Sequence, residues 1–112
     1  MRFMFIHCVD ADVAETGHLD QVIERDVLAW LEEMHARGVR IDGGRLLPVA
    51  TATTVRIRND EVLIADGPFA ETKEQVAGYD VIDCADLEEA LEIASKHPTA
   101  RLGTIEVRPF RD

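Results

Sequence analysis

Hydrophobic and polar positions follow two different periods along this chain, and each period predicts one kind of secondary structure. Residues 2–9 (RFMFIHCV) have the two-residue period of a strand. Both faces of this strand are largely apolar: Phe3, Phe5, His7 and Val9 lie on one, and Met4, Ile6 and Cys8 on the other. A strand that is apolar on both faces must be covered on both, so a layer beyond the domain's own helices is expected.

A helical period follows this strand. Apolar residues recur at steps of three and four from His18 or Leu19 to Arg37, which predicts a helix. Gly38 is expected to end that helix in a left-handed conformation. Residues 10–17, between the strand and the helix, show no period and are expected to form a loop.

The middle of the chain is rich in β-branched residues and turn signals. Residues 53–58 (TTVRIR) and 61–65 (EVLIA) flank the Asn-Asp pair at 59–60 and predict a β-hairpin. The glycine pair at 43–44 is interpreted as another turn, and Pro48 restricts its own segment to a sheet edge or a bulge.

Residues 66–83 (DGPFAETKEQVAGYDVID) form the densest group of turn formers and charges. Its first residues, Asp-Gly-Pro, are expected to end a strand and turn the chain. Residues 72–75 (TKEQ) have the capping-box spacing of a short helical turn, which Gly78 would end.

The C-terminal third predicts a strand, a helix and a strand. Residues 79–84 (YDVIDC) and 103–110 (GTIEVRPF) have the strand period, and an apolar helical stripe lies between them. Asp86 is expected to cap this helix, with Glu89 at the third position after it, and Pro98 is expected to stop it.

Two helices against about five strands, without strict alternation, predict a single α+β domain spanning residues 1–112. We expect an antiparallel sheet with both helices on one face, in a ferredoxin-like topology. That arrangement leaves the second sheet face open. A second copy of the same sheet, packed by two-fold symmetry, is the expected cover, which predicts a homodimer.

Composition excludes several classes of partner. The net charge is −10, with 22 acidic and 12 basic residues and no run of Lys and Arg, so nucleic-acid and anionic-membrane partners are not expected. Asp10 and Asp12 interrupt the apolar N-terminus too early for a signal peptide or a membrane span, which predicts a cytoplasmic protein. Cys8 and Cys84 match no metal or redox spacing and are expected to be reduced, buried thiols.

Common cofactor signatures are missing from the sequence. The four histidines are dispersed and show no H-x-x-x-H spacing, and His35, beside Arg37, is expected at the surface. There is no Gly-rich phosphate loop, serine nucleophile elbow or redox cysteine pair. The sequence therefore predicts neither a metal nor a cofactor.

Residues 66–83, with the EVRP run at 106–109, resemble the YCII-related family and specifically its DGPF branch. The resemblance implies a dimeric α+β barrel of ferredoxin-like protomers, in a family mostly without assigned function. Some YCII-type relatives resemble small enzymes that transfer protons with a His–Asp pair. None of His7, His18 and His97 lies in a matching motif, so the resemblance does not assign such a pair here.

The strand period places polar side chains on the sheet face that the second copy would cover. Arg56, Glu106 and Arg108 are expected there, with His7 and Tyr79 as further candidates. These residues predict a pocket for a small, anionic molecule between the two sheets. The alternative is an ion-pair ladder, in which Glu106 and Arg108 neutralise partners on neighbouring strands.

The loop at residues 66–73 is expected to border this pocket. Asp66 is the candidate catalytic acid or base, and His7 is a second, weaker candidate. Phe69 and Lys73 are candidate ligand-binding residues beside Tyr79. Each also has a simpler interpretation: Asp66 fixes the turn, Phe69 anchors the loop in the core, and Lys73 lies on a solvated face.

Two functional classes, and a dimer without a ligand, remain open from the sequence. The first class is a cofactor-free enzyme doing acid–base chemistry, such as an isomerase, a lyase or a dehydrohalogenase. The second is a ligand-binding or regulatory module, because members of the branch are also joined or adjacent to sigma-factor-like transcription regulators. A cavity holding a titratable group with a strongly perturbed pKa would favour the enzyme.

Overall fold

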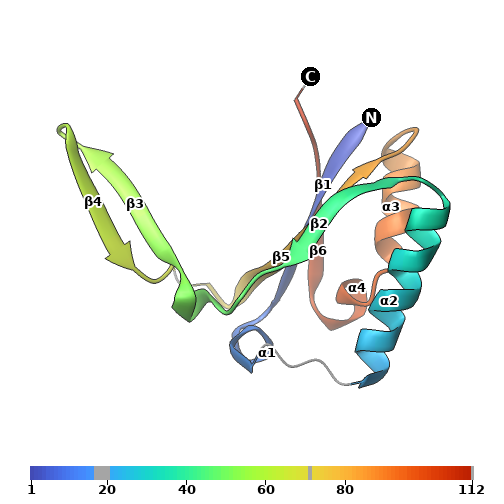
Figure 1. The fold of residues 1–112 in the computed structure, drawn as a ribbon, viewed down its shortest axis with the longest axis horizontal. Helices are drawn as coiled ribbons and strands as arrows, with labels where there is room; N and C mark the ends of the chain where they lie inside the picture. Colours follow the sequence, from blue (N-terminus) through green and yellow to red (C-terminus); the bar gives the residue numbers. More distant parts are fainter. Residues whose placement is uncertain (17–20, 71, 112) are drawn as a thin grey trace.

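The computed structural model describes residues 1–16, 21–70 and 72–111 and has an α+β architecture (Figure 1). Its elements in chain order are β1 (Arg2–Asp10), α1 (Ala11–Thr16), α2 (Gln21–Ala36), β2 (Arg40–Arg45), the 3₁₀ turn η1 (Val49–Thr51), β3 (Thr53–Arg58), β4 (Glu61–Asp66), β5 (Glu74–Asp83), α3 (Leu87–Ser95), α4 (Thr99–Leu102) and β6 (Thr104–Pro109). None of the helices in these ranges is long and apolar enough to cross a membrane.

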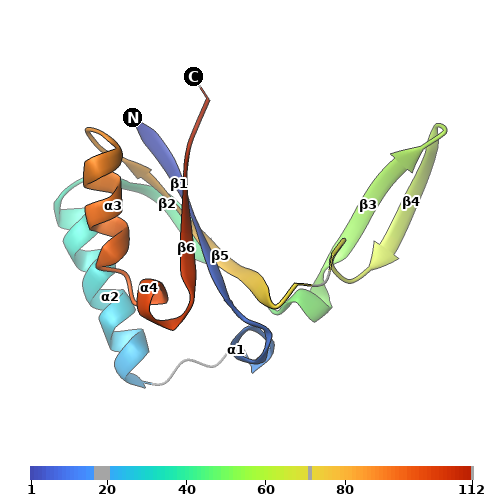
Figure 2. The same ribbon diagram turned by 180° about the vertical axis from the view of Figure 1, so that it is seen from behind.

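The main sheet has the strand order β2-β5-β1-β6, and all of its neighbours are antiparallel. Figures 1 and 2 show α2 and α3 packed side by side on one face of this sheet. This order and layering agree with a ferredoxin-like α+β fold, as predicted. The β3–β4 hairpin is a separate two-stranded sheet inserted between β2 and β5.

The core lies between the main sheet and the two helices. Phe3 and Phe5 of β1 are at most 1% exposed and pack with Trp30 and Met34 of α2 and Ile93 of α3. Ile105 and Val107 of β6 pack against the same core, so the predicted face of β6 is confirmed.

The opposite side of the main sheet is here called the open sheet face. No helix covers it in Figures 1 and 2, and it carries Met4, Ile6, Cys8, Tyr79, Val81, Thr104, Glu106 and Arg108. The side chains of β1 on this face are half-buried. Both cysteines are free thiols, and burial raises the pKa of each; Cys84 is buried, whereas Cys8 is only partly so.

The helix ends follow the sequence prediction where the structure describes them. Gly38 has a φ of +70°, the left-handed conformation expected after α2. The predicted start of that helix at His18 or Leu19 lies outside the described residues. Asp86 caps α3 by accepting a hydrogen bond from the Glu89 backbone N–H at 2.9 Å. Pro98 lies beyond the end of α3 and is the N-cap residue of α4, a short helix that the sequence did not predict.

Three local predictions were wrong. Part of the expected loop at 10–17 is the helix α1, which ends at Thr16. The glycine pair at 43–44 lies inside β2 and not in a turn. Residues 72–75 do not form a helical turn, because β5 already begins at Glu74 and pairs there with Asp10. Strand pairing across the sheet overrides the local capping-box signal, and the Thr72 hydroxyl donates to the Glu74 carbonyl oxygen instead.

The predicted β-hairpin is confirmed. Its turn residues Asn59 and Asp60 have φ values of 52° and 64°, which the primed hairpin turns require. Gly67, just after β4, has a φ of +92°. Phe69, in contrast, is 78% exposed, so it does not anchor its loop in the core of this chain.

Candidate functional site: a buried histidine–aspartate pair at a cavity

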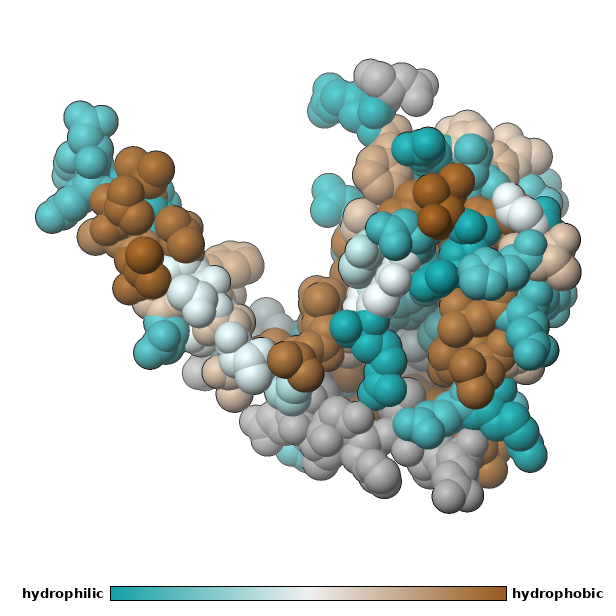
Figure 3. Space-filling view, viewed as in Figure 1, coloured by the Kyte–Doolittle hydropathy of each residue, from teal (hydrophilic) through white to brown (hydrophobic). Residues whose placement is uncertain are grey.

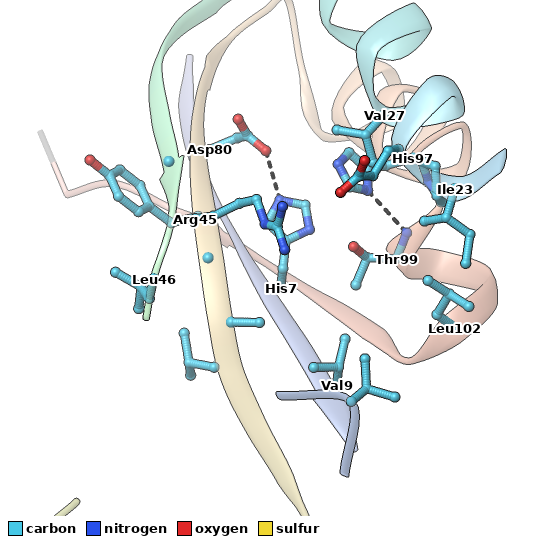
Figure 4. A pocket seen from close by; sticks show the side chains of 18 of the residues that line it. His7, Val9, Ile23, Val27, Arg45, Leu46, Asp80, His97, Thr99 and Leu102 are labelled. Carbon is cyan, nitrogen blue, oxygen red and sulfur yellow. Dashed lines mark hydrogen bonds and ion pairs between the residues drawn. The ribbon is translucent and has the colours of Figure 1, made fainter. Parts of the chain in front are cut away.

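A cavity of about 480 Å³ lies between the helix-covered face of the sheet and α2, α4 and residues 46–49 (Figure 4). We call it the helix-side cavity. Its walls are mostly apolar and include Val9, Ile23, Val27, Leu31, Leu46 and Leu102. Its polar lining residues are His7, Glu24, Arg40, Arg45, Tyr79, Asp80, His97 and Thr99.

A buried pair of His7 and Asp80 forms one wall of this cavity. Both side chains point to the helix-covered face, because β1 and β5 are neighbours and both residues occupy buried positions of their strand periods. His7 Nε2 lies 2.7 Å from Asp80 Oδ2, and the two side chains are only 8% and 7% exposed. Water therefore competes little for this contact.

Arg40 fixes the protonation pattern of the pair. Its Nε donates to Asp80 Oδ1 at 2.7 Å, so this carboxylate oxygen is already used as an acceptor. The other oxygen then accepts from the N–H at His7 Nε2, which leaves the lone pair of His7 on Nδ1. That Nδ1 atom is buried and has no hydrogen-bond partner among the described residues. A buried, unpartnered lone pair is costly for folding, and a molecule bound in the cavity would satisfy it.

The glycine at position 43 makes room for the carboxylate. Gly43 pairs with Asp80 across β2 and β5. A Cβ atom at position 43 would overlap Asp80 Oδ1 and would lie 2.5 Å from the Arg40 guanidinium. The neighbouring Gly44 has open space at the same point. The glycine pair that resembled a turn therefore contains one residue whose missing side chain lets Arg40 reach Asp80.

His97 adds a second imidazole to the site. Its ring centroid is 4.4 Å from that of His7 and 4.7 Å from that of Trp30. The backbone N–H of Thr99 donates to His97 Nδ1 at 3.0 Å, so the proton of the neutral ring is on Nε2. Burial, and then repulsion by the nearby His7 ring whenever that ring is protonated, lower the pKa of His97 to about 4. His97 is therefore a neutral ring at neutral pH.

The same three residues have the donor set of a metal site. One ligand atom from each of His7, Asp80 and His97 lies within 4.8 Å of the others. The Arg40 guanidinium, however, is 2.7 Å from Asp80 and places a positive charge where it would repel a cation. This geometry favours proton chemistry over metal binding, and the absence of a metal stays a prediction.

Of the candidates chosen from the sequence, two line the helix-side cavity. These are His7 and Tyr79, although His7 faces the helices and not the open sheet face as suggested. The side chain of Tyr79 belongs to the open sheet face and donates to Asp42 Oδ2 at 3.4 Å.

The remaining candidates lie elsewhere. Arg56 and Phe69 meet in a second hollow, of about 320 Å³, on the β3–β4 hairpin. Asp66 and Lys73 are exposed at the end of β4 and just before β5. Glu106 and Arg108 form an exposed ion pair with each other at 3.5 Å on the open sheet face. Both belong to β6, so this pair is not a contact between neighbouring strands, and the ladder stays a prediction. Ligand binding by any of these residues stays a prediction.

Sequence reasoning did not select Asp80, Arg40 or His97 as site residues, although His97 was one of three histidines considered for a His–Asp pair. Asp80 had a recognisable signal, since it occupies an inward position between the apolar residues of β5, where an unpaired carboxylate is costly. The sequence left open which alternate residues of this strand face the helices. The contacts of Arg40 and His97 depend on strand register and on α4, and neither had a local signal.

The fold and the site define a small α+β domain with a buried histidine–carboxylate pair at a cavity. The model of the YCII-related domain matches residues 1–112, and the chain belongs to this family. It is 41% identical over 93 residues to an uncharacterised protein of Rhizobium meliloti (strain 1021), which covers 81% of this chain and 75% of that protein. The name of that relative states no activity.

Proposed function

We propose that this protein is a cofactor-free enzyme that moves a proton on a small anionic molecule in the helix-side cavity. His7 acts as the base through Nδ1, and Asp80 holds the ring from the opposite nitrogen. The observation that carries this proposal is the 2.7 Å contact between His7 Nε2 and Asp80 Oδ2, with Nδ1 buried and unpartnered. A bound substrate supplies the partner that Nδ1 lacks.

The pair suits reversible proton transfer. His7 Nδ1 takes a proton from the substrate, and the imidazolium that forms is stabilised by the Asp80 carboxylate. In an isomerisation, the proton returns to a different substrate atom. In an elimination, the electron pair of the broken C–H bond forms a double bond and expels a leaving group. General acid–base catalysis of this kind contributes about 10²–10⁴-fold to the rate.

His97 favours an enzyme over a binding module. It is a buried group of strongly lowered pKa that lines the cavity, and such groups gather at catalytic sites. Its neutral Nε2–H is suited to donate a hydrogen bond to an oxygen that gains negative charge as His7 removes the proton.

The lining supports a small organic acid as the substrate class. Arg40 and Arg45 line the cavity together with Asp80 and Glu24, and their guanidinium groups offer N–H donors to a carboxylate. The remaining walls are mostly apolar side chains. A volume of about 480 Å³ falls within the range of small-molecule sites. An anionic head with an apolar body matches this combination.

We also propose that two copies form a homodimer through the open sheet face. Met4, Ile6 and Val81 give this face an apolar centre, and the helices cover only the opposite side (Figure 2). Packing two such faces against each other buries apolar surface that one chain leaves in contact with water.

The test of catalysis uses a panel of small organic acids. Acids that raise the melting temperature of the protein are incubated with it in D₂O, and loss of substrate C–H signals is followed by proton NMR. We expect His7→Ala to slow this exchange by about 10²–10⁴-fold. Asp80→Asn should slow it as well, whereas His35→Ala, which changes an exposed histidine on α2, should leave it unchanged.

Two results would overturn the catalytic proposal. Exchange that is equally fast in the parent and in His7→Ala would remove His7 from the reaction. Acids that bind the cavity without any exchange in the parent would favour the ligand-binding or regulatory alternative.

A further inference from the structure

The β3–β4 hairpin is an arm that projects from the body of the protein. It extends on the side of the main sheet away from α2 and α3, and both views show it separated from the body (Figures 1 and 2). The radius of gyration is 15.7 Å, whereas a compact chain of this length has about 13 Å. The single chain is therefore more extended than its size requires.

One face of this arm is entirely apolar along its centre. Val55 pairs with Ile64 and Ile57 with Val62, so the four side chains point to the same side. They are between 60% and 68% exposed, and we call them the apolar hairpin face. An isolated two-stranded hairpin is at best marginally stable in water. Large exposed apolar patches commonly mark interaction sites.

We propose that this arm clasps a second copy of the chain, with its apolar hairpin face packed on the part of the partner's open sheet face that the sheet-to-sheet contact leaves uncovered. The inference rests on the dimer proposed above and assigns the arm its role in it. The arm and the open sheet face border the same hollow, which is visible between hairpin and body in Figure 3. A two-fold axis through that hollow covers both apolar surfaces of both copies with one reciprocal contact.

The size of the two surfaces fits this occupant. A stable interface uses roughly 20–30 residues a side, so the open sheet face needs additional contact surface, which the two six-residue strands of the hairpin supply. Each surface alone is smaller than this. The apolar hairpin face and the open sheet face also belong to the same chain. A second copy therefore buries both surfaces, and no other partner is needed.

The decisive comparison uses neighbouring residues on opposite hairpin faces. Val55→Ser with Ile64→Ser removes a directly paired couple from the apolar hairpin face. Leu63→Ser, one position away and 44% exposed, makes the same kind of change on the other face. Sedimentation equilibrium over a concentration series measures dimer dissociation for each. We expect the double variant to raise the dissociation constant at least about 100-fold and Leu63→Ser to change it little.

Hydroxyl-radical footprinting of the unmodified protein gives a second measurement that does not depend on variant folding. Ile57 and Ile64 should be protected at concentrations where the dimer forms and become labelled on dilution. Labelling of these residues that does not change with concentration would overturn the arm proposal.

The outcomes separate the arm from the dimer and from the catalysis. If Ile6→Ser on the open sheet face weakens the dimer and the hairpin variant does not, the arm proposal fails while the sheet dimer stands. A parent that is monomeric at every concentration removes both the dimer and the arm. The proton-exchange assay on His7 is independent of either result.

Discussion

Asp80 is the residue on which the candidate site depends, because its two oxygens serve two different partners. Oδ1 accepts from Arg40 and Oδ2 contacts His7, each at 2.7 Å. His7 could be identified from the sequence, because it is a polar residue at one of the otherwise apolar, inward-facing positions of β1, and it was indeed a candidate. Its pairing with Asp80, 73 positions away, follows from the register of β1 and β5, which no local pattern specifies.

The pKa of His97 predicts a pH dependence of stability. Its folded-state pKa is about 4, below the ordinary value of 6.5, so the unfolded chain binds the proton more readily. The stabilisation from the neutral ring is complete above about pH 6.5 and is lost progressively as the pH falls to about 4. Between pH 7 and pH 5 we expect a loss of roughly 2 kcal/mol in the free energy of unfolding from this group alone.

Urea unfolding at pH 7 and pH 5 measures that loss. His97→Gln removes the titrating ring. Between pH 7 and pH 5 the free energy of unfolding of this variant should therefore fall by roughly 2 kcal/mol less than that of the parent. The comparison is between the two pH-dependent changes, so it holds even if the variant is less stable at both pH values. Equal changes in parent and variant would show that His97 does not titrate between the folded and unfolded states.

At the scale of elements, the long periodic segments were predictable and the short ones were not. The strand at residues 2–9, the helix before Gly38 and the 53–65 hairpin appear where the pattern indicated. Residues 72–75 do not, because their pairing with β1 outweighs a weak capping signal. α4 spans only residues 99–102, too few to show a helical period, yet it carries Thr99, whose N–H orients His97.

The turn after β4 provides the prediction at this scale. Gly67 has a φ of +92°, and its backbone N–H donates to the Ala52 carbonyl oxygen at 2.7 Å, which closes the base of the hairpin. A Cβ there would meet no atom within 4 Å, so Gly67→Ala introduces backbone strain without a steric clash. We expect a loss of about 1 kcal/mol in the free energy of unfolding, measured by urea denaturation.

Gly44→Ala is the matched control for this turn. Gly44 also has open space for a Cβ, and its φ lies outside the left-handed region. It should therefore be tolerated with little change. If Gly67→Ala unfolds at the same urea concentration as the parent, the strained-turn interpretation is wrong.

At the scale of the whole molecule, one sheet separates two surfaces with different chemistry. The helix-covered face encloses the histidine–aspartate pair, whereas the open sheet face and the arm leave apolar side chains in contact with water. The sequence predicted both the α+β layering and the need for a second cover, because β1 is apolar on both faces. The sequence suggested a pocket on the open sheet face instead of the helix-side cavity. The strand period alone does not show that α2 and α4 leave space beside His7.

A charge at the centre of the open sheet face is the strongest test of how two copies would meet. Ile6 lies in the middle of β1, between Glu106 of β6 and Tyr79 of β5. In the proposed dimer Ile6→Lys buries an ammonium in the apolar centre of this face, and the cost of removing that charge from water remains high even with Glu106 on the neighbouring strand. We expect light scattering at micromolar concentration to give twice the chain mass of 12.5 kDa for the parent and a single chain mass for this variant.

Leu91→Lys is the control, because Leu91 is exposed on α3, on the other side of the sheet, and this variant should stay dimeric. Far-UV circular dichroism checks that both variants are folded, and a folded Ile6→Lys protein that remains a dimer would show that the two copies do not meet through this face.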